Sequence, residues 1–595
     1  MNDQQQRLYN LAKYWLPMIL AALPALIPLK LIIRDGVDMP NADQWGTSFA
    51  DMYVKAHRGE LSFWDFTSQH NEHRIFFPKV AFYLLNNVTG WNTKGEMVLA
   101  WLLACGTSAA ILFLCLKTKT RGSGALLWFL CNLLIFTPMQ WENLIWGLGV
   151  INLMPMFWIT AALVVSCSKL DEHVKLLLAG LFSFAATFSS GNGVLAWIIV
   201  TPVLFWSSSL QELRQKRWLL AVWGTVILIT AVMYAFGYKR PEQPPGAQVH
   251  SAGIVAMFDY LMLFLINPFP LPGSEITYLT FATCIIPLML LMLAGITGYG
   301  IFVWSKYRDV ELARHLVVWL VVAAYAVLSG MIAAWFRSPS GVEGAMASRY
   351  VSYGIYLPVA LINLVPIVCA DVARRFPSRW ERFFIQAPAF LGCAILLASL
   401  LGFFGGFQIS RSIGITRRQG KAALLLLNFM PDNPRLVSDV FGFPRDIIQK
   451  ANELSDAGYL RPKLYRTANA LELRAPTPPT IQTGQLEQVA QNGDHINVTG
   501  WAILPGKEKA ADAVVLSYEN ESKQPIVFAM AEIGAKRPEV ANTFGNSGYL
   551  RSGWFADFPI SALPASPKLT RITAWAVDTD TGYLYQLAGD IPVQR

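Results

Sequence analysis

Asp43 is the carboxylate whose place in the chain best suits acid–base chemistry. It lies in a polar segment, residues 38–79, that follows the first long apolar run, and Trp45 comes two residues later. A carboxylate in such a loop can accept the proton of a hydroxyl group, and Trp45 can stack on a sugar ring or pack at a membrane interface. Asp35 and Asp38 compete for the same role. The alternative for Asp43 is structural, because Asp is a favoured N-cap of short helices.

A row of polar residues closes this segment: Asn71, Glu72, His73 and Arg74. Arg74 and Lys79 can bind a phosphate, since a guanidinium matches phosphate oxygens in a bidentate way. Glu72 can orient Arg74 or hold a substrate hydroxyl. His70, Glu72 and His73 are close enough in sequence to suggest a metal, but the HExxH spacing of a zinc site is missing. The pattern favours a hydrogen-bonded network at the base of the loop.

Further polar side chains stand at the ends of later apolar runs. Glu142 lies in a very short turn between two such runs, where a carboxylate must be paired, solvated or used. Its candidate partners are Arg74, Arg337 and Arg349. Asn192 stands between two glycines, a pattern that lets the backbone approach a ligand closely. A tight turn explains the same pattern.

The two later arginines, Arg337 and Arg349, can neutralise a phosphate or pyrophosphate leaving group. The alternative is that they extend toward lipid headgroups. The candidate catalytic residues are Asp43, Glu72 and Glu142. The candidate substrate-binding residues are Asp38, Trp45, Asn71, His73, Arg74, Lys79, Gln140, Asn143, Asn192, Arg240, Arg337, Glu343, Arg349 and Tyr350. Neither a metal nor another cofactor is expected.

The elements that must position these residues are membrane-spanning helices. The chain of 595 residues is 54% hydrophobic and 15% charged, whereas soluble domains carry roughly 25% charged residues. A helix of about 20 apolar residues crosses a bilayer, and this length predicts about eleven spans. They are expected near residues 14–33, 96–116, 124–138, 145–166, 174–189, 193–208, 217–236, 275–303, 314–335, 351–370 and 384–406. The first is expected to be a retained anchor rather than a cleaved signal peptide.

The basic residues give these spans an orientation. The net charge is +9, but Lys and Arg gather in short loops between apolar runs, as the cytoplasmic loops of membrane proteins do. This distribution argues against nucleic-acid binding. The candidate site residues then fall on the opposite face. Short helices are expected at 50–60, 76–86 and 258–269, where they either guide a lipid substrate or simply pack. The seven cysteines are expected to be free thiols.

The chain changes character near its C-terminal third. Residues 1–407 are expected to form the membrane domain, with residues 34–95 as its first outer loop, and residues 408–480 a connector with a helix at 445–457. Six short runs follow that alternate like strands: HINVTGWAIL, AVVLSYEN, PIVFAMAEI, GWFADFPI, LTRITAWAVD and YLYQLAGDI. They predict a β-sandwich over residues 481–595. Trp501, Trp554 and Trp575 either stack on glycans or belong to its core.

Nucleotide-driven chemistry has no support, because no P-loop, no GxSxG elbow and no GxGxxG motif is found. The layout resembles the GT-C glycosyltransferases, polytopic enzymes that use polyprenyl-phosphate sugars. The stretches ADQW, QHNEHRIFFPK, QWENLIWG and SRY are similar to those of bacterial members, including O-antigen-modifying glucosyltransferases of the Gtr type. The resemblance covers roughly residues 10–410.

The resemblance implies an inverting transferase. Asp43 would act as general base on the acceptor hydroxyl, and Arg74, Arg337 and Arg349 would stabilise the phosphate. The donor would be an undecaprenyl-phosphate hexose, with glucose preferred, and the acceptor a lipopolysaccharide O-antigen or another envelope glycan. The enzyme would lie among the lipids of a bacterial inner membrane, with its C-terminal domain in the periplasm. A flippase and a donor synthase would be its partners.

Two other functions remain open at this point. An O-antigen or capsule polymerase or ligase also acts on lipid-linked glycans at this face, but it usually relies on arginines and a histidine in large outer loops. The third hypothesis is a transporter or a non-enzymatic assembly scaffold. A transporter places ionisable residues at mid-membrane depth, whereas the charges of this chain gather near the ends of the spans.

Overall fold

The computed structural model describes residues 15–46, 49–118, 124–239, 253–269, 275–376, 381–564 and 569–594. The chain forms two compact units. The first consists of Met1–Gly36, Phe63–Leu84 and Lys94–Ser410, and the second of Val37–Ser62, Leu85–Thr93 and Arg411–Arg595. The polar segment expected as one loop, residues 34–95, therefore contributes to both units.

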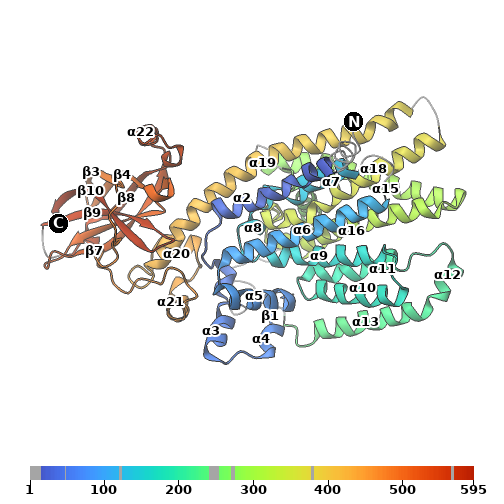
Figure 1. The fold of residues 1–595 in the computed structure, drawn as a ribbon, viewed down its shortest axis with the longest axis horizontal. Helices are drawn as coiled ribbons and strands as arrows, with labels where there is room; N and C mark the ends of the chain where they lie inside the picture. Colours follow the sequence, from blue (N-terminus) through green and yellow to red (C-terminus); the bar gives the residue numbers. More distant parts are fainter. Residues whose placement is uncertain are drawn as a thin grey trace, which may run out of the picture. The chain divides into compact units, whose positions relative to one another are not determined.

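The first unit is a bundle of helices (Figure 1). Among the described residues, nine helical stretches are long and apolar enough to cross a membrane. They are Trp15–Asp35, which ends in α2 (Leu26–Asp35); α6 (Thr93–Thr118); Gly124–Leu144, from α7 (Gly124–Ile135) to α8 (Trp141–Leu144); α9 (Gly149–Ser166); α13 (Arg217–Ala235); Thr277–Tyr307 in α15 (Glu275–Tyr307); Val310–Ser340 with α16 (Val310–Arg337); Ser348–Arg375 with α18 (Tyr356–Arg375); and α19 (Glu381–Leu425).

These nine stretches coincide with nine of the eleven expected spans. The other two, expected at 174–189 and 193–208, are helical but shorter. They form α10 (Glu172–Thr187), of 16 residues, and the apolar stretch Gly191–Leu204, which joins η4 (Gly191–Leu195) to α11 (Ala196–Leu204). Both are below the roughly 20 residues that cross a bilayer without help.

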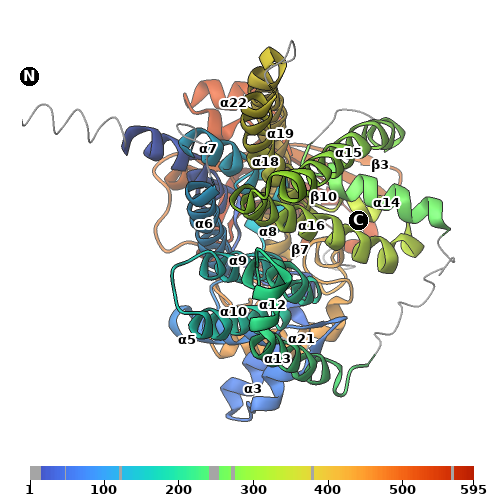
Figure 2. The ribbon, with the colours of Figure 1, turned by 90° about the vertical axis from the view of Figure 1, so that its right-hand side faces the viewer.

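The helices α10 and α11 pack beside α9, and α13 packs against α10 and α12 (Leu210–Gln215). Figure 2 shows α10 between α9 and α13. Asp171 caps α10 by accepting a hydrogen bond from the His173 amide. The turn between α10 and η4 leaves no room for a side chain at Gly193, because a Cβ there would lie 1.7 Å from the carbonyl oxygen of Ala186. This contact fixes where η4 begins.

The core of the first unit lies where α16 packs against α18 and α14 (Ile254–Ile266). Trp319 and Tyr325 of α16 are fully buried, and the ring of Tyr325 lies 5.9 Å from that of Tyr356. A Cβ on Gly330 would approach Phe264 of α14 to 2.9 Å, so the two helices touch closely. The helix expected at 258–269 is therefore a packing element, with its second half buried.

Short elements of the polar segment continue the first unit: α4 (Phe63–Thr67), β1 (Gln69–His70), β2 (His73–Arg74) and the part of α5 (Phe76–Thr89) up to Leu84. The strands pair antiparallel, with His70 opposite His73, so Asn71 and Glu72 form the turn. Asn71 has a φ of 48°, and Asn is one of the few residues that adopt this left-handed conformation readily. The hairpin thus presents Glu72 at its tip. The helix expected at 76–86 is confirmed.

The second unit combines α3 (Ala50–Arg58), α20 (Pro434–Asp439) and α21 (Pro444–Asp456) with a C-terminal β domain. The helices expected at 50–60 and 445–457 are confirmed. An ion pair of 2.6 Å joins Arg58 of α3 to Glu453 of α21, and Lys450 of α21 bonds Asp51 of α3 at 2.5 Å. These contacts hold the start of the polar segment against residues from far along the chain.

The β domain is all-β, as expected, but its strands close into a ring rather than a two-layer sandwich. The strands are β3 (Gly484–Asn492), β4 (His495–Leu504), β5 (Lys509–Ala510), β6 (Ala513–Glu519), β7 (Pro525–Ala535), β8 (Gly553–Pro559), β9 (Leu569–Asp578) and β10 (Tyr583–Gln594). Their order is β3-β10-β9-β6-β7-β8-β4-β5, and β3 also pairs with β4. The first and last strands meet in parallel at Gln485 and Ala588, which closes the ring.

The three tryptophans of this domain are core residues and not glycan-stacking platforms. Trp554 and Trp575 are 2% and 1% exposed, and Trp501 is 8% exposed. The indole N–H of Trp575 donates to Ser517 at 2.8 Å, while Trp501 packs on Phe544. No face of these rings is open to a sugar.

Candidate functional site

Asp43 lies in the second unit, in the short helix η2 (Ala42–Trp45). The side chain is exposed to solvent. Asn41, and not Asp43, caps this helix: its side chain accepts from the Gln44 amide, and the Gln44 side chain accepts from the Asn41 amide. The Asn41 amide group also donates to the Asp439 carbonyl at 2.6 Å. The turn that presents Asp43 is therefore fixed by its neighbours.

The two competing carboxylates of this stretch have structural bonds. Asp35 is buried and accepts from Arg34 at 2.6 and 2.8 Å. Asp38 accepts from the amide and the hydroxyl of Thr93, at 2.8 and 3.1 Å. Both carboxylates are thus engaged with neighbouring protein groups.

Trp45 does not offer its ring to a substrate. It is 1% exposed, its indole N–H donates to the Pro40 carbonyl at 3.0 Å, and its ring packs edge-on against Trp91 with 6.3 Å between centroids. The prediction of a sugar-stacking Trp45 is corrected by this burial. Trp45 instead anchors the turn on which Asp43 lies.

In the first unit, Glu72 is the centre of an ionic cluster. It forms an ion pair with Arg337, the last residue of α16. The ring nitrogen Nε2 of His73 lies 3.8 Å from the Glu72 carboxylate. The side chains of Glu72 and Arg337 are 34% and 48% exposed, so the pair is open to a ligand from solvent. The residue paired with Glu72 is thus Arg337 and not Arg74.

His73 is held between this cluster and the α10–η4 turn. Its Nδ1 accepts a hydrogen bond from the Gly191 amide at 3.2 Å, which leaves the proton on Nε2, the atom that faces Glu72. Burial lowers the pKa of His73 to about 4. The imidazole is therefore neutral at pH 7 and works as a hydrogen-bond donor toward the Glu72 side.

Arg74 and Lys79 are committed to backbone carbonyls, which corrects their prediction as phosphate-binding groups. Arg74 donates to the carbonyls of Thr67, Tyr234 and Phe236. The buried ammonium group of Lys79 donates to the carbonyls of Asp65 and Ser68, and to the Ser68 hydroxyl, at 2.6 to 3.0 Å. Burial lowers the pKa of Lys79 to about 8, while the charge of Asp65 acts in the opposite direction. Both side chains stabilise the loop.

A second ionic pair joins Glu142 of α8 to Arg349 of η7 (Ser348–Tyr350). A guanidinium nitrogen of Arg349 lies 2.8 Å from Glu142, and the Arg349 main-chain amide donates to the same carboxylate at 3.1 Å. The Ser348 hydroxyl donates to the Met139 carbonyl and accepts from the Glu142 amide. Of the three partners proposed for Glu142, the structure selects Arg349, whose side chain is 43% exposed.

A chain of polar contacts connects the two pairs. The Asn143 amide group donates to the Arg349 carbonyl, and its carbonyl oxygen accepts from Asn152 of α9 at 2.8 Å. The Tyr353 hydroxyl donates to Asn152 at 3.1 Å and also interacts with Ser190. Ser190 directly precedes Gly191, whose amide binds His73. The Glu72–Arg337 and Glu142–Arg349 pairs therefore belong to one network, hereafter the polar network.

The other predicted residues occupy several positions. Gln140 is buried and donates to the Ile135 carbonyl. Tyr350 packs on Phe264, and its ring lies 5.2 Å from the Arg349 guanidinium. Asn71 and Glu343 are exposed, and Asn192 is partly exposed in η4. Arg240 lies outside the described residues.

Sequence reasoning missed several members of the network: Asn152, Ser190, Gly191 and Tyr353. Asn152 and Tyr353 stand inside apolar helices, where a polar residue is costly unless it has a partner, and this was the signal available. Ser190 and Gly191 belong to the Ser-Ser-Gly-Asn-Gly stretch, in which Asn192 looked the most functional. A Cβ atom at Gly191 would lie 2.7 Å from the His73 ring. The glycine therefore leaves room for the hydrogen bond between its own amide and His73.

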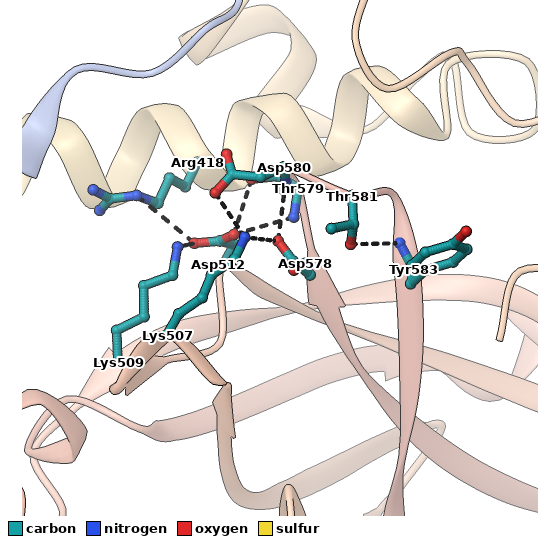
Figure 3. Close-up of polar contacts among 9 residues, drawn as sticks. All are labelled: Arg418, Lys507, Lys509, Asp512, Asp578, Thr579, Asp580, Thr581 and Tyr583. Carbon is teal, nitrogen blue, oxygen red and sulfur yellow. Dashed lines mark hydrogen bonds and ion pairs between the residues drawn. The ribbon is translucent and has the colours of Figure 1, made fainter. Parts of the chain in front are cut away.

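One group of carboxylates in the described chain is close enough to hold a metal: Asp512, Asp578 and Asp580 in the β domain. Protein cations already compensate these groups (Figure 3). The Lys507 ammonium binds Asp578 and Asp580 at 2.5 and 2.7 Å, and Lys509 and Arg418 approach Asp512 to 2.7 and 3.7 Å. The cluster is thus an ion-pair network of α19 and the β domain.

No family model and no curated protein matches this sequence. Among solved structures, the chain is similar to the archaeal oligosaccharyltransferase AglB from Archaeoglobus fulgidus in complex with an inhibitory peptide and a dolichol-phosphate: 14% identity, TM-score 0.38, 76% of this chain and 60% of that one. A complex of an Archaeoglobus fulgidus oligosaccharyltransferase with Zn and sulfate has 14% sequence identity and a TM-score of 0.36. The match covers 75% of this chain and 57% of that one. An Archaeoglobus fulgidus oligosaccharyltransferase tethered to an acceptor peptide has 15% sequence identity and a TM-score of 0.37. The match covers 77% of this chain and 60% of that one. The chain thus spans about 57–60% of the length of these structures.

Proposed function

We propose that this protein is a membrane glycosyltransferase that moves a sugar from a polyprenyl-phosphate carrier to a hydroxyl group of a glycan. The observation that supports this most is the polar network of the first unit. It combines two partly exposed guanidinium groups, Arg337 and Arg349, each positioned by a carboxylate. Arginine presents five donors in a planar fork, and only some of them are used here, so further donors can bind phosphate oxygens.

The proposed reaction needs a base and a stabilised leaving group. The role of the base follows the resemblance to GT-C enzymes, in which the loop carboxylate that Asp43 matches accepts the proton of the acceptor hydroxyl. The hydroxyl oxygen attacks the anomeric carbon from the opposite side, and the bond from that carbon to the phosphate oxygen breaks. The sugar is transferred with inversion, and the lipid phosphate leaves with one additional negative charge. Arg337 and Arg349 offset that charge, since fixed donors near a developing anion lower the barrier.

The finer assignment follows the resemblance of the sequence to bacterial GT-C enzymes. We propose undecaprenyl-phosphate hexose as donor, with glucose as the first sugar to test, and a lipopolysaccharide O-antigen or other envelope glycan as acceptor. The location would be the bacterial inner membrane, with the β domain in the periplasm. A donor synthase and a flippase would supply the lipid-linked sugar. The reaction as written uses no metal or other cofactor.

The test is transfer of a radiolabelled hexose from undecaprenyl-phosphate hexose to a native lipid-linked glycan by the purified full-length protein. Replacing Asp43 with Asn is expected to lower kcat by about two orders of magnitude, the range for loss of a general base. The matched control is Glu60→Gln, which removes another exposed carboxylate of the same polar segment and should leave kcat within twofold.

Each result has a defined meaning. If Asp43→Asn transfers as fast as the wild type, Asp43 is not the base. If the wild type transfers nothing from any monosaccharide lipid but extends an oligosaccharide lipid, the protein is an O-antigen or capsule polymerase and the transferase hypothesis is wrong. If no lipid-linked sugar is consumed at all, the result favours the hypothesis of a transporter or a non-enzymatic scaffold.

A further inference from the structure

A polar cavity lies in the first unit, at the other end of α10 from the polar network. It has a volume of about 250 Å³. The C-terminal end of α10 lies beside Gly191 and His73, whereas residues of its first turn line the cavity. A helix of 16 residues is roughly 24 Å long. The cavity is therefore well separated from the residues proposed for sugar transfer.

Five charged side chains from four parts of the chain meet in this cavity: Glu172 and Lys175 of α10, Glu212 of α12, Lys216 before α13, and Arg314 of α16. Three are positive and two are negative. Both carboxylates form ion pairs with the same cation, because Lys216 lies 3.0 Å from Glu172 and 3.9 Å from Glu212. Lys216 also donates to the Trp206 carbonyl at 3.3 Å.

This pairing leaves Lys175 and Arg314 as the excess positive charge. In the described part of the chain, no carboxylate lies within ion-pair distance of either group. Among the groups that act on Lys175, Arg314 and Lys216 repel its charge and Glu172 attracts it. Two cations that line one cavity repel each other, and an anion bound between them removes this repulsion.

Lys175 and Arg314 share one property, since both side chains donate hydrogen bonds and neither accepts them. Both line the cavity. The partner that satisfies both is an anion rich in acceptor oxygens.

We propose that this cavity binds a phosphate group. Its surroundings fit both a phosphate that belongs to an anionic lipid and a free phosphate ion. Exposed apolar side chains occur on the two helices that border it, including Leu177 of α10 and Trp218 of α13, which are 62% and 72% exposed. Exposed apolar side chains of this kind can contact acyl chains. The site is independent of the proposed transferase reaction.

The experiment uses the full-length protein in a non-ionic detergent and follows its thermal unfolding during titration with three probes. These are dioleoyl-phosphatidylglycerol, dioleoylglycerol, which has the same acyl chains without a phosphate, and inorganic phosphate. A ligand that binds the folded state raises Tm with its concentration. Phosphatidylglycerol or inorganic phosphate is expected to raise Tm, and dioleoylglycerol is not. A rise with phosphatidylglycerol alone identifies a lipid site, and a rise with both identifies a general phosphate site.

Variants connect the effect to the cavity. Arg314→Gln and Lys175→Gln are each expected to weaken the apparent Kd about tenfold, the effect of one charge-assisted hydrogen bond. Arg314→Lys, which keeps the charge, should recover part of the loss. The matched control is Arg214→Gln, an exposed arginine of α12 that does not line the cavity. The proposal is overturned if no phosphate probe raises Tm, or if Arg214→Gln weakens binding as much as Arg314→Gln.

Discussion

Arg337, the last residue of α16, forms an ion pair with Glu72 at the tip of the β1–β2 hairpin. The two residues are 265 positions apart in the chain, and each arrives at its place through a different element. Because both side chains are about one-third to one-half exposed, water screens their attraction. An exposed pair of this kind contributes about 0–1 kcal/mol to the free energy of unfolding. The pair is therefore not a major source of stability.

The first prediction separates a role in sugar transfer from a role in stability. Arg337→Gln is expected to lower kcat/KM for sugar transfer about 100-fold, because it removes a fixed donor to the developing phosphate charge. The free energy of unfolding should change by less than about 1 kcal/mol. Radiometric transfer and chemical denaturation of the same preparation measure both quantities.

A matched control for this prediction is Arg58→Gln, which breaks the exposed Arg58–Glu453 pair of the second unit. It should change both activity and stability little. A large loss of stability with Arg337→Gln, and no selective loss of transfer, would identify the Glu72–Arg337 pair as structural.

The second prediction concerns the turn that holds His73. Gly191→Ala places a methyl group 2.7 Å from the His73 ring, closer than real contacts allow, and the ring is held by its bond to the same residue. We expect a loss of about 1–3 kcal/mol in the free energy of unfolding, the usual cost of overpacking. Gly224→Ala in α13 is the control, because a Cβ there meets nothing within 4 Å. Equal stability of the two variants in denaturant titrations would show that His73 moves aside freely.

The third prediction is a dependence of stability on pH. Burial lowers the pKa of His73 to about 4, against 6.5 in an unfolded chain. Between these values the unfolded chain binds more protons, so stability is complete above pH 6.5 and falls as the pH drops toward 4. A shift of this size corresponds to roughly 1–3 kcal/mol once the partial exposure of the ring is considered.

The variant for this prediction is His73→Asn, which keeps an acceptor for the Gly191 amide but does not titrate. Its Tm should vary less than that of the wild type between pH 4 and 6.5. The control is His173→Asn, at an exposed histidine near the start of α10, which should follow the wild-type curve. An unchanged slope in His73→Asn would assign the acid sensitivity to other groups.

Local sequence patterns predicted much of the fold. The six expected strands correspond to β4 and β6 to β10, and the helices at the start of the polar segment and in the connector were also predicted. Alternation of apolar and polar residues over 7 to 12 positions is a local property and can be read directly. Closure of the ring could not be read, because it depends on one parallel contact between Gln485 and Ala588, about 100 positions apart.

The site was predictable by residue type but not by role. Charge and place at a helix end marked Glu142 and Arg349, and the structure joins them. The same criteria marked Arg74 and Lys79, whose donors are taken by backbone carbonyls of Thr67, Ser68 and Tyr234. A sequence does not show which backbone carbonyls are available to accept hydrogen bonds from side chains. Trp45 was misread for a similar reason, since it is buried against Trp91, which comes 46 positions later.

The last prediction concerns the ion-pair network of the β domain (Figure 3). Asp512 is almost fully buried and accepts hydrogen bonds from Lys509 and from the amide and hydroxyl of Thr579, at 2.7 to 3.1 Å. Asp512→Asn removes the charge that compensates Lys509, and breaking one side of a buried ion pair costs about 3–5 kcal/mol. Asp590→Asn, which breaks the exposed Asp590–Arg571 pair, is the control and should cost less than about 1 kcal/mol.

The same network predicts the response of this domain to acid and to metal ions. Burial opposes the charged form of Asp580, but the hydrogen bond and charge of Lys507 outweigh it and lower the pKa of Asp580 to about 2. The contribution of Asp580 to stability is therefore complete above about pH 4 and is lost as the pH falls from 4 to 2. Calcium ions should not raise Tm, because the Lys507 ammonium already binds Asp578 and Asp580. A calcium-dependent rise in Tm that Asp512→Asn abolishes would show that the ion displaces Lys507, and the network would then be a metal site.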